Sequence, residues 1–199
     1  MLASEKRDGN RKGLKRLSMT PSNAKVGFLI DEIWLLTFHG GLGRTGVYKK
    51  TASEQSRTQF RRFVRSLIDQ EVEDSYRQTP QTHERHCEVL LSLKRRVDEE
   101  YGELFNGDEI TMGVVQKIMN LHLKYRWCLG WITIPPHFPV DAIMLREIPR
   151  YRDTRWSRLA SIEEYRDIIE CAQGIAGDVP LAEWELQTFA RRGIFVHGS

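Results

Sequence analysis

The sequence predicts an all-α fold, a single compact domain of about seven helices. Apolar residues recur every three to four positions in several long segments, which is the spacing of a helix face buried in a core. The alternation typical of half-buried strands occurs once, at 131–134, with no partner to form a sheet. The length allows one hydrophobic core. We therefore expect residues 21–199 to form the domain, after a flexible basic tail at 1–20.

The first half of the chain predicts three helices. The first runs from Ser22 to the Gly40–Gly41 pair, because glycine is common just past a helix end. Ser53 is the expected N-cap of the second helix, whose apolar positions lie opposite a row of arginines. The third is expected to begin at Thr79–Pro80 and to end at Asn106–Gly107.

The second half predicts four more helices. Thr111 begins the fourth, an apolar helix that Gly130 ends. A proline-stiffened turn follows, and Asp141 is expected to cap a short helix after it. The last two helices are expected at 162–176 and 181–191, where apolar residues again recur at helical spacing.

Composition excludes several classes of protein. Hydrophobic residues make up 40% of the chain and charged residues 29%, which is typical of a folded, charge-rich domain. No apolar run approaches the roughly 20 residues that a membrane helix needs. The three cysteines form no CxxC pair, so we expect neither disulfides nor a cysteine zinc site. These features predict a cytoplasmic protein without a membrane partner and without a cofactor.

Two short motifs are candidate ligand sites. Gly41 to Gly46 fits the pattern GxGxxG and resembles the phosphate loop of protein tyrosine phosphatases, in which Arg44 would hold an anion. A helix precedes this loop instead of a strand, and Phe38 stands where a phosphatase has its cysteine, so we expect an interhelical loop. His83, His86 and Cys87 can share one helix face, but no third ligand is placed by sequence, and we expect no metal.

Charge is unevenly distributed along the chain. Residues 113–158 carry eight basic and three acidic side chains, a net charge of +5, and 1–20 carry +4, while the rest of the chain sums to −6. A basic segment on an acidic body favours a local anionic ligand, most often a nucleic acid. The alternative is a set of charged helix faces that are simply solvated.

The most informative segment is Met112–Ile148. Lys117 lies in the first turns of a helix after Gly113, and Asp141 in Pro139-Val140-Asp141 begins another helix. This arrangement resembles the helix–hairpin–helix DNA glycosylase superfamily, with Val115 in place of the second hairpin glycine. The segment is also similar to a group of bacterial proteins of uncharacterised function, which implies no activity.

The glycosylase resemblance implies a role for each matching residue. Lys117 would attack the sugar C1′ of a flipped nucleotide and form an imine, and Asp141 would stabilise the charge that develops on the sugar. The remaining candidates would contact DNA through phosphate binding, base stacking or proton transfer; these are Gly113, Val115, Lys124, Arg126, Trp127, Trp131, His137 and Arg146.

Two functions are therefore expected. The first is a DNA glycosylase/AP lyase-like repair protein that uses the lysine–aspartate pair. The alternative is a non-catalytic helical module that binds nucleic acid or a protein partner in a bacterial regulatory or defence system. Geometry separates them, because an enzyme needs Lys117 and Asp141 to converge in a concave pocket. In a binding module the two side chains would lie apart or face solvent.

Overall fold

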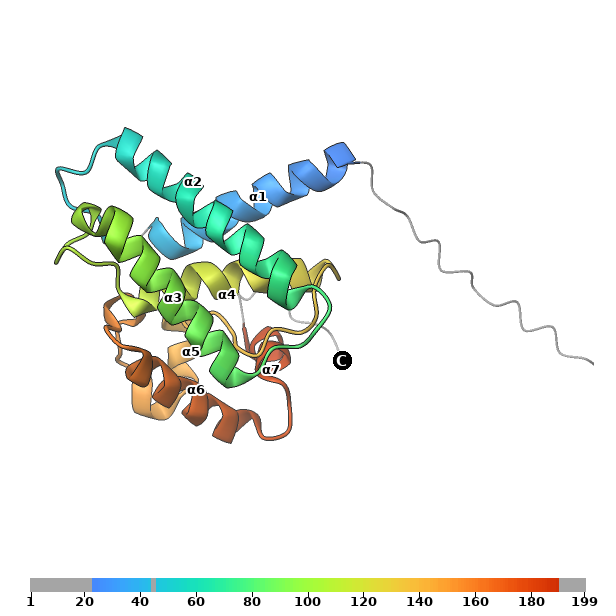
Figure 1. Ribbon diagram of the computed structural model, residues 1–199. Helices are drawn as coiled ribbons and strands as arrows, with labels where there is room; N and C mark the ends of the chain where they lie inside the picture. The colour runs from blue at the N-terminus through green and yellow to red at the C-terminus, as the bar shows by residue number, and fades with distance from the viewer. Residues whose placement is uncertain (1–22, 44–45, 190–199) are drawn as a thin grey trace, which may run out of the picture.

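The computed structural model describes residues 23–43 and 46–189, and these residues form an all-α fold without strands (Figure 1). Short 3₁₀ and π turns, labelled η, extend or connect the helices. The seven α-helices of this part of the chain are α1 (Asn23–Leu42), α2 (Glu54–Glu71), α3 (His83–Tyr101), α4 (Met112–Cys128), α5 (Ala142–Arg146), α6 (Ile162–Ala176) and α7 (Leu181–Thr188). The η turns are η1 (Val72–Tyr76), η2 (Gly102–Leu104), η3 (Pro149–Tyr151) and η4 (Trp156–Arg158).

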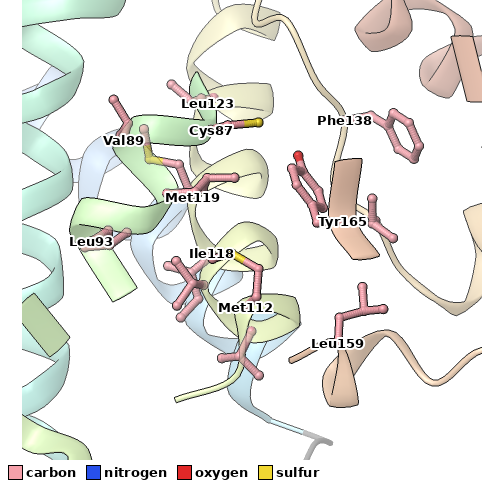
Figure 2. Packing of buried hydrophobic residues seen from close by; sticks show 14 of the residues in the cluster. Cys87, Val89, Leu93, Met112, Ile118, Met119, Leu123, Phe138, Leu159 and Tyr165 are labelled. Carbon is pink, nitrogen blue, oxygen red and sulfur yellow. The ribbon is translucent and has the colours of Figure 1, made fainter. Parts of the chain in front are cut away.

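Helix α4 is the centre of the fold. Every residue from Met112 to Leu123 is buried, so this helix is covered on all sides. It packs against α1, α3, α6 and η4. Figure 2 shows its apolar side chains between α3 on one side and the segments that carry Phe138, Leu159 and Tyr165 on the other. Polar groups on α4 must therefore find partners inside the protein.

The Gly40–Gly41 pair does not end the first helix, which was the prediction. Helix α1 continues to Leu42, and the two glycines face α4. A Cβ atom on Gly40 would lie 2.6 Å from Leu121 Cδ1, and one on Gly41 would lie 2.6 Å from Ile118 Cγ1. The glycines therefore let two helices approach closely, a tertiary need that resembles a stop signal in the sequence.

The predicted N-caps at Ser53 and Asp141 and the predicted helix start at Thr111 are confirmed, and three further helix boundaries differ from the prediction. The side chains of Ser53, Thr111 and Asp141 each accept hydrogen bonds from the first turn of the following helix. The third helix begins later than predicted, because Thr82 and not Pro80 supplies the cap. It also ends earlier, at Tyr101, and passes into η2. Helix α7 ends at Thr188.

The predicted alternating run at 131–134 forms no strand. It is an irregular segment in which Thr133 donates two hydrogen bonds to the Tyr76 carbonyl oxygen. The expected flexible tail at 1–20 and Arg44 of the glycine-rich loop lie outside the described residues. Among the described residues, no helix is long and apolar enough to cross a membrane.

Candidate nucleic-acid interface and buried polar network

Lys117 and Asp141 lie together, as the sequence predicts for the lysine–aspartate pair. Lys117 Nζ is 2.6 Å from Asp141 Oδ2, and the two side chains are only 6% and 16% exposed. Burial lowers the pKa of Lys117, although the Asp141 carboxylate acts in the opposite direction. The Trp156 ring lies near the amine, with its centroid 5.9 Å from Nζ.

The second oxygen of Asp141 is used to begin a helix. Oδ1 accepts hydrogen bonds from the backbone N–H groups of Ile143 and Met144, at 2.9 and 3.0 Å, which caps α5. The carboxylate therefore joins the first turn of α5 to the middle of α4. Lys117 and Asp141 line neither the pocket between α2 and α3 beside Met119 nor the pocket beside Arg126 and Trp131. The pair converges, but inside the protein.

Gly113 and Val115 are buried within the first turns of α4. The Gly113 N–H donates to the Leu159 carbonyl oxygen at 3.0 Å. A Cβ atom on Gly113 would lie 1.7 Å from the Trp156 carbonyl oxygen, so this glycine is needed for the close approach of η4. The amide that the resemblance assigns to a DNA phosphate thus has a partner within the chain.

Lys124 and Arg126 also have partners within the chain. Lys124 Nζ lies 2.7 Å from Oε1 of Glu185, a residue that is 2% exposed and whose pKa burial raises. Arg126 is 5% exposed and donates to Asp69 at 2.6 Å and to Glu73 at 3.3 Å. All three cations of α4, counting Lys117, are therefore neutralised by carboxylates from other parts of the chain.

Arg126 belongs to a buried cluster with aromatic walls. Its Nε donates to His122 Nε2 at 2.9 Å, so this histidine nitrogen carries no proton. The His122 ring stacks on Trp34 at a centroid distance of 4.1 Å, and Trp34 Nε1 donates to Asp69. Burial lowers the pKa of His122, which is therefore neutral in the folded protein at pH 7.

The two predicted stacking tryptophans lie at the end of α4. Trp127 is half-buried against the core. Trp131 lines a pocket of about 370 Å³ together with Arg126 and residues of α1 and η1. The structure thus places Trp131 beside Arg126, at a pocket that Lys117 and Asp141 do not line.

Arg146 belongs to a group of cations with a different environment. The segment from Arg146 to Arg158 contains five exposed arginines and two exposed acidic residues, a net charge of +3. None of these arginines forms an ion pair with a described residue; they are Arg146, Arg150, Arg152, Arg155 and Arg158. We name these five residues the arginine segment.

The backbone of the arginine segment is held firmly. Met144, Leu145 and Ile148 are buried at its start, and Leu159 is buried at its end. Turn η4 is fixed on the N-terminus of α4, where the Thr111 hydroxyl donates to the Ser157 carbonyl oxygen at 2.9 Å. The arginines therefore extend from a rigid support, although the segment itself has little regular structure.

His137 is buried in a chain of hydrogen bonds. Asn120 Nδ2 donates to the Tyr165 hydroxyl at 3.0 Å, and the hydroxyl lies 2.8 Å from His137 Nδ1. His137 Nε2 lies 2.7 Å from His83 Nδ1. Burial lowers the pKa of His137 well below its ordinary value, so the ring is neutral. The predicted contact between His137 and a nucleic acid is not possible in this arrangement, because His137 is 1% exposed.

A group of metal-ligand type completes this chain. His83 and Cys87, one turn apart on α3, meet His137 from the loop before α5, and one ligand atom from each lies within 4.8 Å of the others. The sequence predicted no metal for His83, His86 and Cys87, because the third ligand, His137, is fifty residues beyond Cys87 along the chain. The four-residue spacing of His83 and Cys87, which places both side chains on one helix face, was the only indication of this group in the sequence. His86 does not belong to it.

Helix α1 carries an exposed apolar face that sequence analysis missed. Phe28 and Leu35 are each 64% exposed and Leu36 is 44% exposed. These positions fall on one side of the helix, away from α4. Most of α1 is apolar all round, so its amphipathic signal is weak and the exposed side could not be separated from the buried side by pattern.

Comparison of the chain with protein-family models, with curated proteins and with solved structures found no match. The resemblance to the helix–hairpin–helix glycosylases therefore stays a prediction.

Proposed function

We propose that this protein is a nucleic-acid-binding helical module that holds a phosphate backbone with the arginine segment. The observation that carries the proposal is that five exposed arginines lie close together in the chain without an ion pair among the described residues. An unpaired guanidinium is free to make the bidentate contacts with phosphate that arginine favours.

The local fold also favours binding. Because buried residues and η4 fix the backbone on α4, binding would order only side chains and would lose little entropy. Tyr151 and Trp156 lie within the segment and are partly exposed, so bases of a single strand could stack on them.

Binding of labelled single-stranded and duplex oligonucleotides at several salt concentrations tests the proposal. Five phosphate contacts predict that log K falls with log[salt] with a slope of about −3.5 for single strands and about −4.5 for duplex DNA. The triple variant Arg150→Gln/Arg152→Gln/Arg155→Gln is expected to bind about tenfold or more weakly and to reduce the steepness of this slope by about 2 to 3.

A matched control removes the same charge elsewhere. Arg62, Arg95 and Arg96 are exposed on α2 and α3, and replacing all three by Gln changes the net charge equally. This control is expected to retain most of the affinity of the wild type. Equal losses in the two triple variants would mean that only the total charge matters and would overturn the proposed interface.

The lysine–aspartate pair supports a second candidate function, the glycosylase/lyase activity implied by the resemblance. The supporting observation is the 2.6 Å contact between Lys117 Nζ and Asp141, with a lysine pKa that burial lowers toward the nucleophilic neutral amine. The pair would have to open, since both groups are buried and the carboxylate also caps α5.

Borohydride trapping on an oligonucleotide with an abasic site tests this candidate. An adduct formed by the wild type and by Lys124→Gln, but lost in a folded Lys117→Gln variant, would support a lysine lyase. No adduct with the wild type would overturn the role of Lys117 as a nucleophile. In that case the arginine segment remains the basis of the proposed function.

A further inference from the structure

We propose that His83, Cys87 and His137 form a zinc site, with the fourth coordination position open to water. The site is separate from the arginine segment, and the proposal does not depend on nucleic-acid binding. It rests on where the three ligand atoms lie and on the side chains that orient them.

The ligand atoms are close to the spacing that tetrahedral zinc requires. Zinc–nitrogen bonds of about 2.0–2.1 Å and zinc–sulfur bonds of about 2.3 Å place neighbouring ligand atoms about 3.4–3.6 Å apart. Here one ligand atom from each of His83, Cys87 and His137 lies within 4.8 Å of the other two, so the three atoms must move closer together when a metal ion binds. His83 is partly exposed, so its ring has room to turn and present one nitrogen to the metal ion.

A hydrogen bond to the ring nitrogen that does not face His83 orients the His137 side chain. Its Nδ1 lies 2.8 Å from the Tyr165 hydroxyl, which Asn120 also contacts. Histidine ligands of zinc are commonly held in this way by a hydrogen bond from the ring nitrogen that does not bind the metal. Tyr165 and Asn120 are both fully buried, so this support is rigid.

The protons of the site balance on metal binding. In the metal-free chain the Tyr165 hydroxyl and His137 Nδ1 share one hydrogen bond, and His137 Nε2 and His83 Nδ1 share another. When zinc binds His137 Nε2, the neutral ring carries its proton on Nδ1, which then donates to the Tyr165 oxygen. The Cys87 thiol loses its proton to solvent as the Zn–S bond forms, so one proton is released for each metal ion bound.

The charges around the site are mixed. Burial raises the pKa of the Cys87 thiol, and the Arg166 guanidinium beside it acts in the opposite direction. Glu84, on the first turn of α3, offsets part of the Arg166 charge. His86 packs edge-on against His137 and stays neutral, since burial lowers the pKa of His86 to about 3. A histidine–thiolate site of this kind favours zinc over the hard cations Mg²⁺ and Ca²⁺.

Access to the site is provided by His83. Cys87 is 0% exposed and His137 is 1% exposed, whereas His83 is partly exposed at the N-terminal end of α3. A metal ion would therefore enter past His83. Once bound, it would join α3 to the loop that leads to Asp141 and α5, two segments separated by about fifty residues of chain.

Cobalt substitution tests the proposal with a spectroscopic readout. The full-length protein, first treated with a chelator, is titrated with Co²⁺ alone. We expect intense visible bands of tetrahedral cobalt and a near-ultraviolet thiolate-to-cobalt band at one equivalent, both abolished by added Zn²⁺. An absence of these bands in the wild type would overturn the proposal.

Variants locate the metal. Cys87→Ser is expected to lose the thiolate band, and His83→Ala, which removes a partly exposed ligand, is expected to weaken binding at least tenfold. Cys128→Ser is the matched control, because this cysteine is exposed and far along the chain from the site. A thiolate band that survives in Cys87→Ser, or that disappears in Cys128→Ser, would contradict the assignment.

Thermal unfolding of the wild type tests the site even if a ligand variant does not fold. Zn²⁺ is expected to raise the Tm of the wild type and of Cys128→Ser, since a ligand that binds only the folded state stabilises it. A Tm that is the same with zinc and with chelator would argue against the site as strongly as the absence of cobalt bands.

Discussion

The two halves of the basic stretch at 113–158 use their charges in opposite ways. In α4, Lys117, Lys124 and Arg126 are all paired with carboxylates and are largely buried. In the arginine segment, all five guanidinium groups are exposed and have no ion pair among the described residues. The first half therefore holds the fold together, and the second half is free to bind a ligand.

This difference shows why counting charges along a chain does not locate a binding surface. The partners of Lys124 and Arg126 come from distant positions, namely Glu185 in α7, Asp69 in α2 and Glu73 in η1. A window of sequence around α4 contains the cations but not these acids. Glu147 and Asp153 lie between the arginines of this segment, yet neither forms an ion pair with a described residue.

The largest expected effect comes from breaking the buried Lys117–Asp141 pair. Asp141→Ala removes the cap of α5 and leaves Lys117 unpaired at 6% exposure, so we expect a loss of about 3–5 kcal/mol in the free energy of unfolding. Urea denaturation measures this loss. Nucleic-acid affinity, corrected for the unfolded fraction, should change much less.

A second pair of variants separates the cap from the charge. Asp141→Asn retains a capping side chain but removes the negative charge, and adding Lys117→Met then removes the unpaired cation. The double variant is expected to be more stable than Asp141→Asn alone. If it is less stable, the pair contributes through something other than compensation of a buried charge.

Two glycine-to-alanine variants test how firmly η4, which lies within the arginine segment, is held against α4. Gly113→Ala forces a Cβ atom against the Trp156 carbonyl oxygen, so we expect a loss of at least about 2 kcal/mol and weaker nucleic-acid binding as η4 is displaced. Gly174→Ala in α6 meets no atom within 4 Å and should stabilise the protein by about 0.5–1 kcal/mol. If Gly113→Ala and Gly174→Ala change the free energy of unfolding equally, η4 can move away from α4 at little cost in stability.

The stability of the buried cluster around Arg126 should also depend on pH, through His122. Because the folded-state pKa of His122 is lowered, only the unfolded chain takes up this proton below about pH 6.5. Stability from this group is therefore complete above pH 6.5 and falls by at most about 1.4 kcal/mol per pH unit below it. Urea denaturation of wild type and His122→Gln between pH 7 and 5 should show a shallower slope for the variant. If wild type and His122→Gln lose stability equally with falling pH, His122 is not the group whose protonation destabilises the protein.

The smallest effect on stability is expected in the arginine segment. Arg150→Gln should change the free energy of unfolding by less than about 0.5 kcal/mol, because the side chain is exposed and has no carboxylate partner. The same variant should reduce the steepness of the salt dependence of nucleic-acid binding by about 1. A stability loss above 1 kcal/mol would contradict the division between paired and unpaired cations.

Much of the fold follows from the sequence alone. The all-α class, the caps at Ser53, Thr111 and Asp141, and the bounds of α6 depend on spacing and side-chain chemistry within a few residues, and all agree with the structure. The closeness of Lys117 and Asp141 was predicted through the resemblance. The boundary that failed at Gly40–Gly41 failed because those glycines serve a contact with α4, which is distant in sequence.

The candidate sites were decided by tertiary structure. Whether a cation is neutralised depends on the acids that other helices bring to it, so Lys124 and Arg126 could not be told from Arg146 by sequence. The metal-ligand group likewise depends on the loop that carries His137 folding back onto α3. Local chemistry determines where helices begin, whereas burial and long-range contact determine which polar side chains remain free to act.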